Sequence, residues 1–461
     1  MNQTPYAPLD AAVLQRLRDI FGEGLLVAPE DVKPFERDES GLMRPVEAVV
    51  LAENAGQISA LLKLANEKRF PVTPRGAGTG LAGGALCAHG GVVLSLEKMN
   101  RILAIDAPNL CAVAEPGVLT KTLRDAAEEK GLFYPPDPAS LDISSIGGNA
   151  ATDAGGPACV KYGVTKDYVL GLTAVLPTGD IIETGVSTRK GVVGYDLTRL
   201  IVGSEGTLGV ITKLILKLIP RPKTVKSMAA LFPDARAAVS AVGGVMTQGL
   251  SPCAVEFMDH KCLGLVESLL PFPLPQGAPA MLLLETDGDP EQTAKDIAAI
   301  QETCLAYGAT EIIPAQSEEG RERLWNVRRQ ISLRINESAP VYLPEDVAVP
   351  IARIPDLIAA LPAIGQEFDL DIYAFGHAGD GNIHLNLTAS ALEKRDRAEA
   401  SLRPLIRKVL DLGGTMSGEH GVGIAKQPFI TMELSARSIE LQRGVKALFD
   451  PNGVLNPGKI F

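Results

Sequence analysis

The sequence predicts an α+β protein of two domains, and three observations lead to that prediction. The chain has 461 residues, a length that suits two to four domains. Its 46 glycines gather in clusters beside short runs of Val, Ile and Leu, without a fixed period, which excludes collagen-like chains. Between residues 226 and 365, helical stripes alternate with strand-like runs such as Met281–Glu285, as in an α+β domain.

The elements follow in order along the chain. Residues 10–70 predict a helix, a loop, a strand at Val46–Leu51 and a second helix. The two helical stripes consist of Leu14, Leu17 and Ile20, and of Ile58, Leu61, Leu62 and Leu64. Residues 71–220 and 366–425 are glycine-rich with short strands, and a last helix at Ala436–Phe449 precedes a turn. We therefore expect one domain over residues 1–222, a second over 223–425, and a C-terminal segment, 426–461, that returns to the first.

Composition excludes several classes of protein. The formal net charge of −11 disfavours nucleic acid as a partner, because phosphate binding needs a basic face. We find neither an apolar run of about 18 residues nor the pattern of a secretory signal. The six cysteines form no C-x-x-C pair, so they suit reduced cytoplasmic thiols better than an iron–sulfur cluster or a zinc ribbon. The expected location is the cytoplasm.

The first glycine cluster predicts a phosphate-binding loop. Gly78–Gly83 fits the pattern G-x-G-x-x-G, but a nicotinamide-binding crossover requires a helix of about ten residues after the glycines. Here the next strand, Gly91–Leu96, begins too soon. What remains is a strand–loop–strand unit with many free N–H groups beside Arg75, which suits a pyrophosphate. A glycine turn without a ligand is the alternative.

Two further glycine clusters strengthen the ligand hypothesis. One runs over Ser144–Gly156 after the proline-rich Pro135–Pro138, and the other over Gly203–Ile211. Three such loops, each beside a strand, are typical of backbone that lines a long, flat ligand.

These loops carry a family resemblance. Arg75–Gly80, Ser145–Asn149 and Gly203–Gly206 together resemble the FAD domain of the vanillyl-alcohol oxidase/p-cresol methylhydroxylase flavoproteins. The branch that the chain resembles most is D-lactate dehydrogenase, with the glycolate oxidase catalytic subunit and D-2-hydroxyglutarate dehydrogenase as close relatives. The resemblance implies a two-part FAD-binding domain of the p-cresol methylhydroxylase type plus an α+β substrate (cap) domain with an antiparallel sheet.

The resemblance also implies which residues contact the cofactor. Covalent members carry a flavin-linking His in the first loop, where this chain has Thr79, so non-covalent FAD is expected. The expected contacts lie in the three loops, in the segment before the second loop, and in the C-terminal tail. They are Arg75, Gly76, Gly78, Thr79, Gly80, Pro136, Asp137, Ser144, Gly147, Gly148, Asn149, Thr152, Gly155, Glu205, Gly206, Gly209, Ile211 and Asn456.

The second half of the chain carries a histidine motif. In His377–His384, the pair Asp380-Gly381 favours a two-residue hairpin turn that would place His377 directly opposite His384. Cβ atoms of such a pair lie about 4.5–5.5 Å apart, so both imidazoles could bind one metal ion. Asn386 would share their face, while Ile383 and its alternate neighbours would face the core.

A second motif, Ser417–Gly423, contains Glu419 and His420. Glu419 could complete a site of two histidines and one carboxylate that leaves positions open for substrate oxygens, and His420 would then be free as a base. The alternative is that both histidines are merely structural and Glu419 is solvated.

The resemblance assigns roles to these residues. It implies a divalent metal (Zn, Mn or Fe) bound by His377, His384 and Glu419, with His420 as the catalytic base and Asn386 as a substrate contact. The substrate-carboxylate arginine of the relatives lies in a Trp-x-x-Arg segment, which points to Arg328 in Leu324–Arg329. Arg329 and Arg334 remain alternatives.

The expected reaction is oxidation of a small D-2-hydroxy acid by hydride transfer to the flavin. The 2-hydroxyglutarate enzymes place a Lys before their counterpart of Asp346–Pro350, whereas Val341–Asp346 has no cation here. D-lactate is therefore favoured, with glycolate and D-2-hydroxyglutarate as alternatives. A non-catalytic flavin-binding electron-transfer subunit and a metal-dependent hydrolase are alternatives from other classes.

The sequence shows no cluster-binding cysteines and no convincing nicotinamide site that could accept electrons from the flavin. The resemblance suggests an iron–sulfur subunit, an electron-transferring flavoprotein or a quinone, and a partner of this kind could hold the protein at a membrane. The chain could also form a homodimer.

Overall fold

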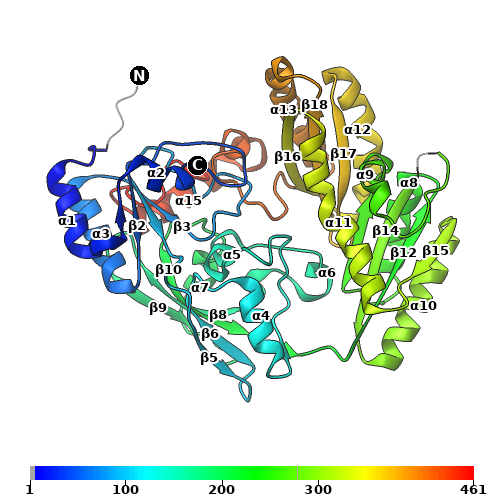
Figure 1. Ribbon diagram of the computed structural model, residues 1–461, viewed down its shortest axis with the longest axis horizontal. Coiled ribbons are helices and arrows are strands. Elements are labelled where there is room, and N and C mark those ends of the chain that lie inside the picture. The colour runs from blue at the N-terminus through cyan, green and yellow to red at the C-terminus, as the bar shows by residue number, and fades with distance from the viewer. Residues whose placement is uncertain (1–5, 278) are drawn as a thin grey trace. The chain divides into compact units, whose positions relative to one another are not determined.

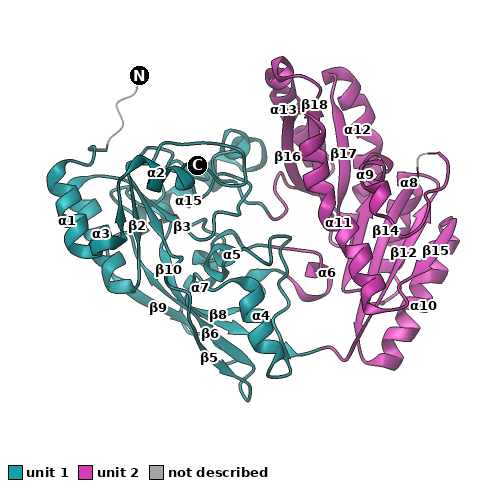
Figure 2. Ribbon diagram, in the orientation of Figure 1, with its two compact units in different colours: residues 1–154, 164–221, 420–461 teal, residues 155–163, 222–419 magenta. Residues whose placement is uncertain are grey.

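The computed structural model describes residues 6–277 and 279–461. The chain divides into two compact units, which Figure 2 colours separately. Unit 1 consists of Met1–Ala154, Val164–Arg221 and His420–Phe461, and unit 2 of Gly155–Gly163 and Pro222–Glu419. The chain therefore passes between the units four times.

Unit 1 begins with a four-stranded sheet in the order β1-β2-β4-β3. Its strands are β1 (Leu25–Leu26), β2 (Ala48–Leu51), β3 (Val72–Arg75) and β4 (Val92–Ser95). Strand β4 is parallel to both β2 and β3. Helices α1 (Ala11–Phe21) and α3 (Ala55–Lys68) start at the capping side chains of Asp10 and Asn54 and bury their apolar stripes against the sheet.

The link between β3 and β4 is a glycine loop. Residues 76–91, all of them described, contain no helix. The prediction that these glycines do not introduce a nicotinamide-binding crossover is therefore confirmed.

Unit 1 continues with a five-stranded antiparallel sheet in the order β5-β6-β10-β8-β9. The strands are β5 (Ile102–Asp106), β6 (Cys111–Ala114), β8 (Val169–Val175), β9 (Ile181–Gly185) and β10 (Val210–Lys217). The second and third predicted glycine clusters lie beside this sheet, around the short helices α5 (Ile146–Thr152) and α7 (Leu197–Ile201).

The end of the chain completes unit 1. Helix α15 spans Ala436–Phe449, as predicted, and Leu455 then forms a parallel bridge with Val72 of β3. The Lys446 ammonium donates to the carbonyl oxygens of Thr207 and Leu455, at 2.8 and 2.7 Å. Segments far apart in sequence are thus joined at the first and third glycine loops.

Unit 2 is built on a seven-stranded antiparallel sheet in the order β15-β12-β14-β13-β17-β18-β16 (Figure 1). Its strands are β12 (Thr224–Phe232), β13 (Ala254–Met258), β14 (Ala280–Gly288), β15 (Glu311–Pro314), β16 (Val341–Ala348), β17 (Asp371–His377) and β18 (Asn382–Ala389). This is the α+β architecture with an antiparallel sheet that the sequence predicts.

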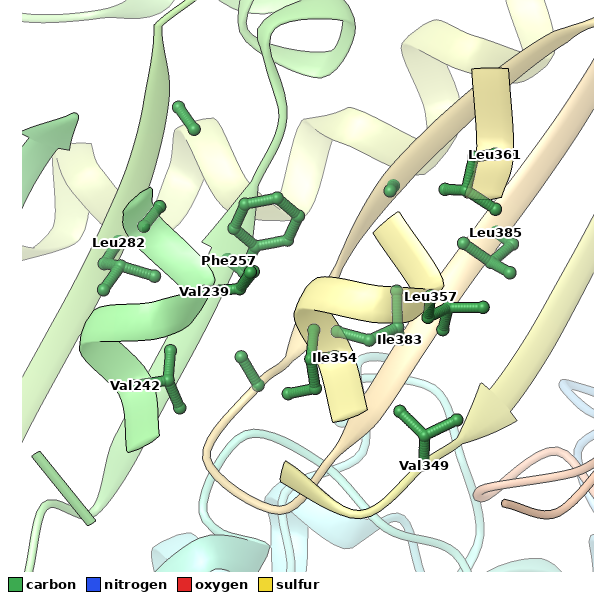
Figure 3. Packing of buried hydrophobic residues seen from close by; sticks show 14 of the residues in the cluster. Val239, Val242, Phe257, Leu282, Val349, Ile354, Leu357, Leu361, Ile383 and Leu385 are labelled. Carbon is green, nitrogen blue, oxygen red and sulfur yellow. The ribbon is translucent and has the colours of Figure 1, made fainter. Parts of the chain in front are cut away.

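Helices cover both faces of this sheet. One face packs on α8 (Ala235–Met246), α10 (Pro290–Ala306), α12 (Ile354–Phe368) and α13 (Arg395–Asp411). Figure 3 shows Val239 and Val242 of α8 and Leu357 of α12 beside the strand residues Phe257 and Ile383. The other face packs on α9 (His260–Val266) and α11 (Glu318–Ser338).

Strand β18 alternates between the two faces. Ile383, Leu385 and Leu387 are fully buried in the larger core, as predicted. His384 and Asn386 therefore point to the α9–α11 face, where they can meet polar partners.

The short segment Gly155–Gly163 leaves unit 1 and packs within unit 2. It contains helix α6 (Cys159–Tyr162), and two of its side chains meet Asp287 of β14. The Lys161 ammonium lies 2.5 Å from Asp287 Oδ1, and the Tyr162 hydroxyl donates to Oδ2 at 2.7 Å.

Among the described residues, no helix combines the length and the apolar character needed to cross a membrane.

Candidate active site

Among the described residues of unit 1, a few buried side-chain polar atoms have no hydrogen-bond partner. The guanidinium of Arg75, at the end of β3, lies 5.6 Å from the ring of Phe35, and its Nη1 atom has no hydrogen-bond partner. The same holds for the Tyr134 hydroxyl, just before the proline-rich segment that leads to the second glycine loop, and for Ser204 Oγ, within the third. Burial lowers the pKa of Arg75, although Asp38 opposes this effect. Unsatisfied buried donors near glycine loops fit an anionic ligand such as the pyrophosphate of FAD.

The glycines of these loops have two different environments. A β-carbon at Gly147 would lie 2.9 Å from Pro116 Cα, and one at Gly206 would lie 2.7 Å from Pro74 Cγ. These two glycines therefore permit close packing of loop on scaffold. At Gly80 a β-carbon would meet no atom within 4 Å, so this part of the first loop is open to a ligand.

Other residues expected to contact the cofactor are already bonded within unit 1. Asn149 Nδ2 donates to Thr120 Oγ1 at 2.7 Å, and the same hydroxyl lies 2.8 Å from Ser144 Oγ. Asn456 Nδ2 donates to the carbonyl oxygens of Gly84 and Glu205, at 3.1 and 2.7 Å. These side chains join the loops to one another.

The structure brings the residues of the three loops and the tail together in unit 1, with one exception. Gly155 belongs to unit 2, where it lies against Glu419. Its place is thus beside the predicted metal ligands.

The predicted metal ligands converge in unit 2. His377 of β17, His384 of β18 and Glu419 each offer one ligand atom, and these atoms all lie within 4.8 Å of one another. Glu419 Oε1 lies 3.3 Å from His377 Nε2 and 3.5 Å from His384 Nε2. Two ligand atoms of a tetrahedral ion with bonds of about 2.1 Å are separated by roughly 3.4 Å. The donor set and its spacing therefore fit a divalent cation.

The predicted hairpin register is wrong by two residues. Phe375, rather than His377, is the partner of His384, and the pairing of β17 with β18 ends there. The Gly379 N–H donates to Val255 of the neighbouring strand β13 at 3.2 Å, so the connection cannot close into a two-residue turn. Because the shift is an even number, both histidines keep the same face, and their ring centroids are 5.1 Å apart.

A buried carboxylate of β13 stands behind His377. Glu256 pairs directly with His377 in the sheet and is fully buried. Its Oε1 lies 2.6 Å from His377 Nδ1, and its Oε2 lies 2.5 Å from Arg328 Nε. Burial alone would raise the pKa of Glu256, but His377 and Arg328 lower it to about 2. Burial alone would lower the pKa of His377, but the carboxylates of Glu256 and Glu419 raise it well above its ordinary value.

A second buried carboxylate holds the loop that carries Glu419. Asp346 Oδ2 accepts hydrogen bonds from the backbone N–H groups of Gly418 and Glu419, at 2.9 and 2.8 Å. Its Oδ1 accepts from Asn382 Nδ2 at 2.5 Å. The side chain of Asp346 is completely buried and lies 3.7 Å from His384 Nδ1.

The structure separates Arg328 from the alternative arginines. Arg328 is 8% exposed, packs over the ring of Phe375 at 4.7 Å, and has no described partner for its two Nη groups. Arg329 and Arg334 are exposed and pair with acidic residues of their own helix, Glu322 and Glu337. Of these three arginines of helix α11, Arg328 is therefore the one with a buried guanidinium.

Asn386 and His420 have different surroundings. Asn386 is buried on the same face as His384 and donates to the Tyr342 hydroxyl at 3.1 Å. His420 is the first residue of the last unit 1 segment and directly follows Glu419 in the chain.

Sequence reasoning missed Glu256 and Asp346. The sequence does contain an indication that Glu256 has a buried partner, because this residue is the only charge in the apolar strand Ala254–Met258. A charged residue inside a buried strand requires a partner. For Asp346, the sequence offers only an acidic pair within a strand.

Comparisons with known proteins agree with this architecture. Residues 46–185 match the family described as FAD binding domain, and residues 221–460 match FAD linked oxidases, C-terminal domain. The chain is 43% identical to glycolate oxidase subunit GlcD of Bacillus subtilis (strain 168), over 90% of this chain and 89% of that protein. It is 38% identical to D-lactate dehydrogenase of Anaerostipes hadrus, over 100% and 99% of the two chains. It is 34% identical to D-2-hydroxyglutarate dehydrogenase of Stutzerimonas stutzeri (strain A1501), over 98% and 99%.

Solved structures share the fold at low identity. p-Cresol methylhydroxylase with bound substrate superposes with a TM-score of 0.78 at 19% identity, over 97% of this chain and 96% of that one. 4-Ethylphenol oxidase from Gulosibacter chungangensis gives 0.79 at 20% identity, over 98% and 96%. With family matches to both parts and relatives of such identity over nearly its whole length, the chain belongs to the FAD-linked oxidases of the vanillyl-alcohol oxidase/p-cresol methylhydroxylase fold.

Proposed function

We propose that this chain oxidises a small 2-hydroxy acid, with D-lactate as the first candidate, to the corresponding 2-oxo acid with FAD as the oxidant. One observation carries the proposal: two buried histidines and a partly exposed carboxylate lie in the same unit as a buried arginine whose two Nη groups have no hydrogen-bond partner among the described residues. The names of the relatives add that such chains act on glycolate, D-lactate and D-2-hydroxyglutarate.

Different side chains bind the substrate carboxylate, the cation and the rest of the substrate in this proposal. Arg328 holds the substrate carboxylate through its Nη groups, as paired charge-assisted hydrogen bonds. His377, His384 and Glu419 would hold a divalent cation (Zn, Mn or Fe). When bound, that cation would supply positive charge that favours ionisation of the 2-hydroxyl group. Asn386 orients the substrate from the same face of the sheet.

The reaction removes two hydrogens from the substrate. His420 takes the hydroxyl proton as general base. The glycine loops of unit 1 would hold non-covalent FAD, which when bound would supply the two-electron oxidant. Arg75 and the open part of the first loop, with Thr79 and Gly80, bind its pyrophosphate.

The substrate carries an uncharged side chain in this proposal. Strand β16, which runs beside His384 and Asn386, has no Lys or Arg between Val341 and Ala348. A second carboxylate would therefore lack a partner on this strand. Glycolate is the second candidate, because the relative with 43% identity is named for it.

Electrons leave through a separate acceptor. An iron–sulfur subunit, an electron-transferring flavoprotein or a quinone would suit a chain that is similar to a named oxidase subunit. Attachment at the membrane surface would then depend on that partner.

The proposal is tested by anaerobic reduction of the purified flavoprotein. A panel of D- and L-2-hydroxy acids is mixed with the protein, and bleaching of the flavin absorption is followed. D-lactate should bleach the flavin fastest, and L-lactate should be much slower. Faster bleaching by D-2-hydroxyglutarate would reverse the order of substrates. A colourless protein with hydrolase activity, or flavin that no acid reduces, would refute the proposal.

A further inference from the structure

The two carboxylate oxygens of Glu256 contact two different residues of the proposed active site, His377 and Arg328. Oε1 meets His377 Nδ1 at 2.6 Å, and Oε2 meets Arg328 Nε at 2.5 Å. The side chain has no exposed surface, so no water can replace either partner.

We propose that Glu256 is a positioning residue that couples metal binding to recognition of the substrate carboxylate. The inference rests on the proposed function, since it takes His377 as a metal ligand and Arg328 as the anion-binding group. It goes beyond that function by making one carboxylate responsible for the geometry of both.

The contact with His377 fixes the state of the imidazole. A ring that donates from Nδ1 to a carboxylate keeps its Nε2 lone pair available for a cation. That Nε2 atom is the one that faces Glu419, at 3.3 Å. A carboxylate behind a ligating histidine also makes the ligand more basic and holds the plane of its ring.

The contact with Arg328 fixes the direction of the guanidinium. With Nε bound to Glu256 and the group stacked 4.7 Å over the ring of Phe375, the planar fork has one orientation. The two Nη groups are then left for an incoming carboxylate. If Glu256 moves, both the imidazole and the guanidinium must move with it.

If Glu256 were only structural, its loss would lower stability without affecting metal or substrate binding. Another buried carboxylate, Glu285, provides a control for this case. Glu285 is a buried carboxylate on the neighbouring strand β14, and it binds Arg321 and Trp325 of helix α11, which also carries Arg328. Among the described residues, no hydrogen bond joins Glu285 to His377 or to Arg328. Loss of Glu285 should therefore reduce stability without changing the two functions.

The test compares Glu256→Gln with Glu285→Gln in the full-length flavoprotein after treatment with a chelator. Gln offers one acceptor oxygen, so its amide NH₂ would face either the imidazole or the guanidinium, both of which are donors. Mn²⁺ binding is measured from the loss of the free-ion EPR signal, and KM for D-lactate is measured separately from kcat. E256Q should bind Mn²⁺ about 10–100-fold more weakly and show a raised KM. E285Q should match the wild type in both, although both variants unfold at lower temperature.

The outcomes distinguish a failure of the proposed metal site from a failure of the role proposed for Glu256. A wild-type protein that binds no Mn²⁺ counts against the proposed metal site and so removes the basis of this inference. A folded E256Q protein with wild-type Mn²⁺ affinity and KM overturns the inference alone. If E256Q does not fold, Glu256→Asp decides: it keeps both acceptors but shortens the side chain by one methylene, so both functions should weaken together.

Discussion

Gly155 and Glu419 are in contact: a β-carbon at position 155 would lie 2.6 Å from Glu419 Oε2 and 3.2 Å from its Cβ atom. The segment that carries Gly155 is held to the sheet through Lys161 and Asp287. Glu419 therefore has little room to shift toward this segment.

The first prediction follows from this contact. Gly155→Ala should displace Glu419 and weaken Mn²⁺ binding by at least about 10-fold, an effect of the size seen when support for a ligand is lost. Equilibrium dialysis of the metal measures it. Gly243→Ala in helix α8 is the control, because a β-carbon there meets no atom within 4 Å. Unchanged binding in the Gly155 variant would mean that Glu419 is not a ligand.

The second prediction concerns the loop held by Asp346. Asp346→Asn replaces one of the two carboxylate oxygens with an NH₂ group. Where this group takes the place of Oδ2, it faces the N–H groups of Gly418 and Glu419 and leaves these two donors without their acceptor. We expect a loss of about 2–3 kcal/mol in unfolding free energy, the range for buried hydrogen bonds to a charged group. Denaturant unfolding checks the value, and metal affinity should fall in parallel. A stable variant that loses only metal would assign Asp346 to the site rather than to the loop.

The third prediction distinguishes the arginines of α11. Arg328→Lys keeps the charge but loses the planar fork, so kcat/KM for D-lactate should fall by roughly 100-fold, mainly through KM. Arg329→Lys should behave as the wild type, because Arg329 is exposed and pairs with Glu322. Steady-state kinetics with an artificial acceptor measures both. The reverse pattern would move the anion site to Arg329.

The fourth prediction is a dependence of stability on pH. Lys459 is 4% exposed, and burial lowers its pKa to about 8, against the opposing charges of Cys87 and Glu205. Between this value and the pKa of about 10.4 in the unfolded chain, the unfolded state binds more protons at this position. The lysine therefore makes unfolding free energy rise with pH above about 8, and its contribution is constant below that pH.

Lys459→Met should remove this rise. From pH 7 to pH 9.5, the wild type should gain about 2 kcal/mol relative to the variant. Unfolding in denaturant with excess FAD at both pH values gives the double difference, from which the loss of the lysine's hydrogen bonds cancels. Parallel pH profiles would show that the ammonium is not held at a lowered pKa.

Local patterns in the sequence are enough for many elements of the fold. The stripe of Ile58, Leu61 and Leu64 predicts helix α3, and the bounds of α15 agree with those expected. These elements depend on periodicity and capping, which act over a few residues. The three glycine loops are recognisable for the same reason.

The inner parts of the site depend on contacts that no local pattern contains. Glu256 and His377 are separated by 121 positions, and they meet only because β13 and β17 are neighbours in the sheet. The hairpin register failed for a related reason: Gly379 is bonded to β13, a strand outside the hairpin. The convergence of His377, His384 and Glu419 could be predicted, whereas the buried carboxylates behind them could not.

The division of the chain has a consequence for biosynthesis. The first segments of unit 1 are synthesised before most of unit 2. The last segment of unit 1, His420–Phe461, is synthesised only after unit 2 ends at Glu419. These late residues include Val422 and Gly423, whose N–H groups bind the buried Glu205, and Asn456, which ties two glycine loops. The FAD-binding loops of a nascent chain would thus stay incomplete until translation has passed through the whole of unit 2. Flavin binding would then occur only in a chain whose seven-stranded sheet has already been synthesised.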